Sequence, residues 1–142
     1  MGNPLYDTLF GRHADNPDVV LHLPDGSTVT YAAFLRITAQ YAGALNTLGL
    51  AAGDRLAVQI AKSPHALAVY AACVQAGIVF LPLNTAYTPD EVQYFVENSG
   101  AGVVRCDDSK QAGLADVAHA CGAHLGTLNN DGSGTFSDLA AA

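Results

Sequence analysis

The stretch Cys73–Val92, CVQAGIVFLPLNTAYTPDEV, decides the fold of this protein. It begins as the end of an apolar helix that stops at Gly77, and it continues as the apolar run Ile78–Leu83, a predicted strand. Thr88-Pro89-Asp90-Glu91 then has the pattern of a capping box, which starts the next helix. Helix, strand and helix with short connections predict parallel βαβ units. Because the strand is apolar throughout, we expect both of its faces to be buried.

The same alternation continues on both sides of this stretch. Before it, Arg55–Ile60 reads as a strand, and Ser63 with Pro64 starts the helix that follows. After it, Gly102–Cys106 is a predicted strand, Ser109 is the expected cap of the next helix, and His124–Leu128 is a weaker final strand. The fold class is therefore α/β with parallel βαβ units.

The amino-terminal part has a different pattern. Two β-rich runs, Val19–Leu23 and Ser27–Tyr31, flank a Pro-Asp-Gly turn and predict an antiparallel hairpin. Thr30 is placed to cap a helix over residues 31–48, and Gly49 is placed to end it. We expect this hairpin to precede the parallel units.

Composition excludes several classes of protein. The chain has 142 residues, of which 50% are apolar and 13% charged, and this suits one domain with a sizeable core. A formal net charge of -7 argues against a nucleic acid or an anionic membrane as partner. No run of about 18 apolar residues predicts a membrane span. Three cysteines, an odd number without a C-x-x-C pair, favour reduced thiols and a cytoplasmic location.

Two motifs towards the carboxyl end have a functional and a plain interpretation. HACGAH, His119–His124, offers two histidines and a cysteine, but Gly122 is expected to end a helix between them and no fourth ligand lies nearby. We therefore favour a helix end over a metal site. DGSG at 131–134 resembles a phosphate-cradling loop, but no lysine follows it and no helix is expected there. We interpret residues 129–142 as an exposed loop and a frayed end.

A further motif, CDDSK, covers Cys106–Lys110 at the carboxyl end of a predicted parallel strand, the edge where open α/β sheets bind ligands. Its aspartates suit a metal or a ribose, although we favour a solvated cap of the following helix. One functional hypothesis is thus a free-standing α/β module that binds a small ligand or a partner without enzymatic activity. Its pocket would lie over three loops, Ala61–Ser63, Asn84–Thr88 and Asp107–Ser109.

Three motifs, in order, resemble those of the adenylate-forming superfamily of acyl-CoA synthetases. TYAAFL at Thr30–Leu35 is similar to its first core motif, and GLAAGDRLAV at Gly49–Val58 to the segment that follows. VQAGIVFLPLN at Val74–Asn84 resembles the second core motif. Within the superfamily, Phe80–Thr88 and Val104–Lys110 look most like malonyl-CoA synthetases.

The resemblance implies that residues 1–142 are the amino-terminal portion of a large AMP-binding domain that stops before the family's phosphate loop. The form T-S-G-T-T-G-x-x-K-G is absent from this sequence. Ala33 and Gln75 stand where the family usually has an acidic residue and a lysine. We expect no catalytic, cofactor-binding or metal-binding residue within these 142 positions.

The implied activity is that of an acid–thiol ligase of fatty acid metabolism, carried by the parent protein. Malonate or methylmalonate, ATP and CoA would give malonyl-CoA, AMP and pyrophosphate through an acyl-adenylate. ATP, Mg and CoA are expected to bind the parent and not this part of it, which would act as scaffold. We expect the apolar helix Ala66–Ala76 to be left partly uncovered, so that the rest of the polypeptide or a second copy covers it.

Overall fold

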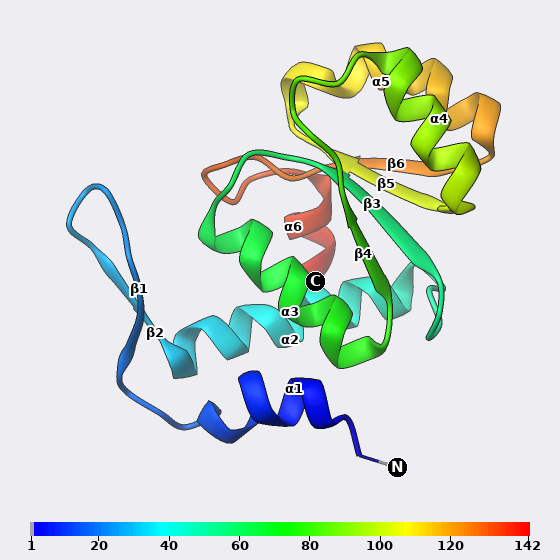
Figure 1. Ribbon diagram of the computed structural model, residues 1–142. Coiled ribbons are helices and arrows are strands. Elements are labelled where there is room, and N and C mark those ends of the chain that lie inside the picture. The colour runs from blue at the N-terminus through cyan, green and yellow to red at the C-terminus, as the bar shows by residue number, and fades with distance from the viewer. Residues whose placement is uncertain (1) are drawn as a thin grey trace.

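The computed structural model describes residues 2–142 and contains two separate sheets (Figure 1). The first is an antiparallel pair, and the second is a four-stranded parallel sheet in the order β4-β3-β5-β6. The predicted α/β fold with an amino-terminal hairpin is confirmed. The strands are β1 (Val19–His22), β2 (Thr28–Thr30), β3 (Arg55–Gln59), β4 (Val79–Pro82), β5 (Val103–Cys106) and β6 (His124–Thr127).

Three helices begin where their capping residues predict. The hydroxyl of Thr30 accepts a hydrogen bond from the N–H of Ala33, and Ser63 does the same for Ala66. Thr88 and Glu91 form the predicted capping box. The helices are α1 (Pro4–Leu9), the 3₁₀ turn η1 (Gly11–His13), α2 (Tyr31–Thr47), α3 (Pro64–Ala76), α4 (Pro89–Ser99), α5 (Asp108–Cys121) and α6 (Thr135–Ala141).

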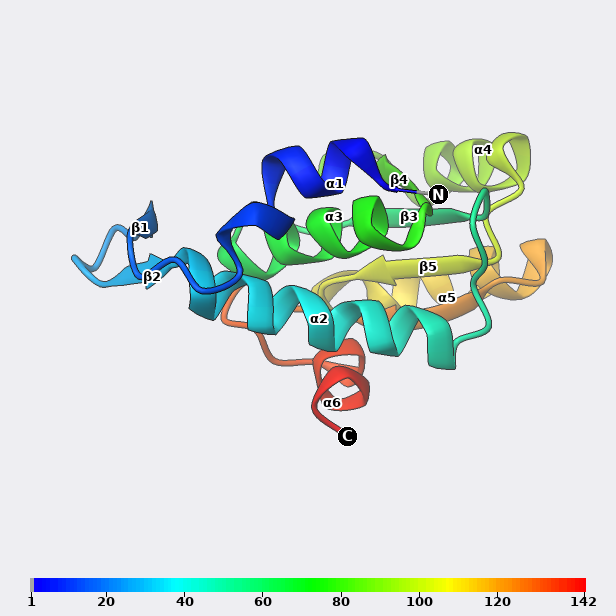
Figure 2. The same ribbon diagram turned by 90° about the horizontal axis from the view of Figure 1, so that it is seen from below.

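Helices cover both faces of the parallel sheet, which makes three layers. Leu56 and Val58 of β3 face a core that they share with α2, α3 and α6. Ala57, between them, faces the opposite core, which α4 and α5 complete. Figure 2 shows α2 and α3 in front of the strands and α5 behind them. This arrangement leaves the carboxyl ends of all four strands at one open edge.

Strand β4 departs from the expectation of burial on both faces. Val79 is 48% exposed, and Phe80 and Leu81 are half-buried. The expectation was wrong because β4 lies at the edge of the sheet, where it has a neighbour on only one side. Strand order, which the local sequence does not encode, decides this exposure.

The start of α5 also differs from the expectation. Asp107, and not Ser109, is the residue before the first helical turn, and its side chain caps no backbone N–H. Ser109 lies inside that turn, where its hydroxyl donates to the Asp107 carboxylate. The helix therefore begins earlier than predicted, and the serine holds the aspartate in place.

Residues 129–142 are not all loop. After the turn at 131–134 the chain forms α6, and Phe136 is 1% exposed. The Phe136 ring lies 5.1 Å from the ring of Tyr41 and 4.8 Å from the guanidinium of Arg105, measured between centres. The expectation of a frayed end, and of no helix after the DGSG turn, was wrong because one aromatic anchor docks this segment on α2 and β5.

Helix α3 is more covered than expected. Ala68, Val69, Ala71, Ala72 and Cys73 are buried, chiefly against α2. At its other end, Asn3 donates to the carbonyl of Val74 and ties α1 to α3. The chain itself thus covers most of the helix that we expected to need a partner, although Leu67 remains 37% exposed. Over residues 2–142, no helix has the length and apolarity required to cross a membrane.

Candidate functional site

The carboxyl edge of the parallel sheet contains the point where strand order reverses. After β3 the chain crosses to β4 on one side, and it then returns to form β5 on the other side of β3. Loops that leave β3 and β5 in opposite directions open a crevice, and such crevices bind ligands in α/β sheets. The edge loops 60–63 and 107–109 flank it.

Polar side chains fix the loops of this edge in position. Asp108 donates its backbone N–H to Asn129 Oδ1 at 2.8 Å, and Asn129 Nδ2 donates to Asp108 Oδ2 at 2.9 Å. The two contacts join the loop after β5 to the loop after β6. Because each asparagine and aspartate group is matched, this junction is a built feature of the edge.

The loop after β4 is tied to the same edge through its carbonyl groups. Lys110 Nζ donates to the carbonyl of Thr85 at 2.7 Å. The buried amide of Gln59 donates to the carbonyls of Asn84 and Tyr87 at 2.9 and 3.1 Å. Gln59 is a polar residue inside a strand, and these two bonds satisfy its amide group.

A shallow hollow of about 420 Å³ lies over the edge, lined by Ala61, Asp107, Ser109 and Asn129–Asp131. The sequence predicted that Ala61–Ser63 and Asp107–Ser109 meet at this edge, and of these two loops Ala61, Asp107 and Ser109 line the hollow whereas Lys62, Ser63 and Asp108 do not. Asn84–Thr88, the third predicted loop, does not line the hollow. Sequence reasoning missed Asn129–Asp131, although these residues follow a predicted parallel strand and the same edge rule applies to them.

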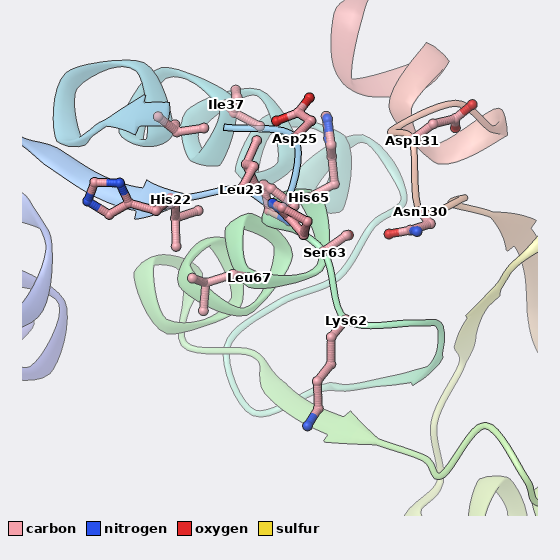
Figure 3. A pocket seen from close by; sticks show the side chains of 14 residues that line it. His22, Leu23, Asp25, Ile37, Lys62, Ser63, His65, Leu67, Asn130 and Asp131 are labelled. Atoms are coloured by element: carbon pink, nitrogen blue, oxygen red, sulfur yellow. The ribbon is translucent and has the colours of Figure 1, made fainter. Parts of the chain in front are cut away.

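A larger cavity of about 780 Å³, here called the hairpin groove, lies between the β1–β2 hairpin and the start of α3. Leu21–Asp25 and Val29 form one wall, and Ile37, Lys62–His65, Leu67 and Asn130–Asp131 form the rest. Figure 3 shows side chains from the hairpin, from α2, from the start of α3 and from the loop 130–131 around it, with the Lys62 side chain extending away from the others. No sequence motif predicted this groove.

His65 is the most constrained polar side chain of the groove. Its Nδ1 lies 2.7 Å from the hydroxyl of Tyr41. On its other side the ring presses on Gly132, where an added Cβ would lie 2.2 Å from Nε2. Burial lowers the pKa of His65, which Asp131 raises in part. The imidazole is thus held as a packed, neutral group that joins α2, α3 and the loop 129–134.

Two carboxylates stand at the rim of the hairpin groove. The pKa of Asp25 is lowered by hydrogen bonds from Ser27, and the pKa of Asp131 is lowered by hydrogen bonds from Ser133 and by His65. Both groups are therefore ionised at neutral pH. Since Lys62 extends away, the rim presents net negative charge to whatever enters the groove.

The remaining sequence motifs have structural roles. Gly122, with a φ of 63°, ends α5 as predicted, so HACGAH is a helix end. His119 and His124 are exposed, and His124 Nδ1 lies 3.3 Å from Arg105 Nη1. Within residues 2–142, no three His, Cys, Asp or Glu side chains converge as metal ligands would. Asp131 accepts from the N–H and hydroxyl of Ser133, so the Gly-rich segment is a closed turn.

Known proteins match this chain over most of its length. Residues 9–137 match the family described as AMP-binding enzyme. The fatty acid–[acyl-carrier-protein] ligase ScoC of Streptomyces coeruleorubidus is 33% identical over 97 residues, which are 68% of this chain and 19% of ScoC. The feruloyl-CoA synthase of Amycolatopsis sp is 38% identical over 79 residues, 56% of this chain and 16% of that enzyme.

Solved structures give the same assignment. ATP-bound MatB from Rhodopseudomonas palustris superposes on the whole of this chain with a TM-score of 0.93 and 39% sequence identity. The match covers 28% of the MatB chain. This chain thus spans less than a third of the length of each of these three relatives. Its sequence and its fold together place it in the family of AMP-binding, adenylate-forming enzymes.

Proposed function

We propose that this chain is the opening section of the large domain of an acid–thiol ligase that converts malonate or methylmalonate, ATP and CoA into malonyl-CoA, AMP and pyrophosphate. One observation carries the proposal: the superposition of the chain on ATP-bound MatB, a malonyl-CoA synthetase, at 39% identity. A small dicarboxylate, ATP and CoA are the partners that this activity requires, with an acyl-adenylate as the intermediate.

The proposed role of the chain within that ligase is scaffold. Adenylation needs groups that cradle the phosphates of ATP and neutralise their charge, usually backbone N–H groups, lysine and Mg²⁺. The residues at the sheet edge do not fit a polyphosphate, because the hollow presents Asp107 and the ionised Asp131. In this proposal ATP, Mg²⁺ and CoA are held by other parts of the polypeptide.

The test is malonate-dependent exchange of labelled pyrophosphate into ATP. We expect no exchange with the 142-residue chain, and we expect exchange with a chimera in which it replaces the matching section of R. palustris MatB. MatB itself is the positive control. Benzoate and acetate, each in place of malonate, test which carboxylic acid the chimera activates. A folded chimera without exchange, or exchange by the chain alone, would overturn the proposal.

The second candidate is a free-standing module that binds a small ligand without enzymatic activity. It draws support from the hollow in which Ala61, Asp107 and Ser109 meet as the sequence predicts. Thermal-shift screening of the chain alone separates the two candidates. A small molecule that raises the melting temperature of the wild-type chain, but not that of Asp107→Ala, would favour the binding module.

A further inference from the structure

An apolar cavity of about 420 Å³, here called the α3–β4 cavity, lies between helix α3 and the edge of the parallel sheet. Val58 of β3, Leu67 and Tyr70 of α3, and Phe80 of β4 are among the residues that line it. Leu67 separates it from the hairpin groove, which the same side chain also lines. A volume of several hundred Å³ is in the range of sites that bind small molecules.

The walls of the α3–β4 cavity are held in place by the rest of the chain. The rings of Tyr70 and Phe80 meet edge to face, with 5.6 Å between their centres and an angle of 81°. Phe10 packs on the other side of Tyr70, 6.5 Å from it between ring centres. Val58 is buried. An apolar ligand therefore meets preformed walls and loses little free energy in ordering them.

The polar groups of this cavity are hydrogen-bond donors at the start of α3. Lys62 lines the cavity, and its side chain turns away from the hairpin groove (Figure 3). A lysine in such a place lays its methylene stem on apolar side chains and keeps the ammonium at the mouth. The hydroxyl of Ser63, which also lines the cavity, accepts from the N–H of Ala66 and keeps its own hydrogen to donate.

The charge of the α3–β4 cavity is opposite to that of the hairpin groove. Among residues 2–142, no aspartate or glutamate lines the α3–β4 cavity, whereas Asp25 and Asp131 line the hairpin groove. An anion is therefore attracted to the first cavity and repelled by the second. Apolar walls with a cation at the mouth complement a molecule that is apolar along its body and negative at one end.

We propose that the α3–β4 cavity is a binding site for a small amphipathic anion, a free molecule with one apolar chain or ring and one anionic head group. The apolar body packs against Leu67 and Phe80, and the head group accepts hydrogen bonds from Nζ of Lys62 and from the hydroxyl of Ser63. The ligand is bound and released without chemical change. This inference goes beyond the ligase activity proposed above and does not depend on it.

Titration calorimetry and the melting temperature of the 142-residue chain test the site with octanesulfonate, kept below its micelle concentration. A sulfonate cannot form an acyl-adenylate, so it reports binding alone. We expect one molecule to bind and to raise the melting temperature in a saturable way. Octanol and octylammonium, with the same chain and no anionic head, should bind at least about tenfold more weakly. No binding, or equal binding of all three, would overturn the proposal.

Matched variants locate the ligand. Lys62→Gln should weaken octanesulfonate binding about tenfold, whereas Arg36→Gln, an equal charge change at an exposed position of α2 outside the cavity, should not. Ala66→Leu, which narrows the cavity, should weaken it by a similar factor, and Asp25→Asn in the hairpin groove should leave it unchanged. Tighter binding to Asp25→Asn, with no effect of Ala66→Leu, would place the ligand in the hairpin groove and overturn the proposal.

The MatB chimera supplies the remaining outcomes. We expect it to bind octanesulfonate as the chain alone does, and a folded chimera without binding would overturn the proposal. Vesicles of phosphatidylglycerol that capture the chain, without any binding of free octanesulfonate, would identify a membrane surface as the partner and would also overturn it. Octanesulfonate binding in a chimera that lacks malonate-dependent pyrophosphate exchange would refute the proposed activity while the binding site stands.

Discussion

The two sheets of this protein are held by different means. The parallel sheet of β3–β6 has helices on both faces, and Leu56, Ala57 and Val104 within it are almost completely buried. The β1–β2 hairpin has no buried residue and is joined to α2 at Thr30. Helices stabilise the first region on both of its faces, whereas the hairpin packs only a few half-buried side chains, Val20, Leu21 and Val29, against the core.

This difference teaches where the stability of the chain resides. Burial of apolar side chains drives folding, so the parallel sheet and its helices carry most of the free energy of unfolding. The hairpin contributes less to that free energy, because Val20, Leu21 and Val29 are only partly buried where they pack against the core. Three predictions bear on this comparison.

The largest effect should come from the centre of the parallel sheet. Leu56 is 0% exposed, and Leu56→Ala should lower the free energy of unfolding by about 2–5 kcal/mol, because it leaves a cavity. The hairpin counterpart Val19→Ala, at 40% exposure, should change it by less than about 0.5 kcal/mol. Urea titrations of both variants measure this, and equal losses would break the comparison.

A smaller effect is expected at the cap of α4. The hydroxyl of Thr88 accepts from the N–H of Glu91, and Glu91 Oε2 accepts from the N–H of Thr88 at 2.7 Å. Thr88→Ala should cost about 1 kcal/mol of unfolding free energy, since the N–H of Glu91 loses the hydroxyl that accepts its hydrogen bond. Thr28→Ala, at an exposed hairpin threonine, is the matched control. An unchanged urea midpoint for Thr88→Ala would show that the cap does not contribute to the free energy of unfolding.

The smallest effect concerns pH and sharpens the boundary between the regions. Burial lowers the pKa of His65 in the folded chain, so the unfolded chain binds a proton more readily just below the ordinary histidine pKa of 6.5. The stability that the neutral imidazole contributes is therefore fully present above pH 6.5, and it is lost as the pH falls below that value. His65→Gln should flatten the fall in unfolding free energy between pH 7 and pH 5.5. Parallel curves for wild type and His65→Gln would contradict this.

Much of the parallel region follows from local chemistry. Thr30, Ser63 and Thr88 precede their helices with the residue types that cap N–H groups, and the structure confirms each of them. Two apolar runs predicted β3 and β5, because strands that are covered on both faces need apolar residues throughout. These features depend on neighbours within a few residues, which the sequence displays directly.

Other features depend on contacts between residues that are distant in the sequence. The exposure of β4 follows from its place at the sheet edge, and α6 is held by the docking of Phe136 on Tyr41 and Arg105. At the candidate site, the edge rule predicted three loops, and only Ala61, Asp107 and Ser109 from two of them line the hollow. The same rule would have found Asn129 had it been applied to the last strand. The hairpin groove was beyond such reasoning, since it exists only where the hairpin meets α3.

Pro82 gives the exposed edge of the parallel sheet a protection against aggregation. Along β4 the N–H groups of Val79 and Leu83 donate to β3, so the alternate positions, Phe80 and Pro82, face outward. A proline has no N–H to offer, and an edge with a missing donor is a poor template for a strand of another molecule. The edge that tertiary structure leaves uncovered is thus a poor starting point for the growth of β-aggregates from copies of this chain.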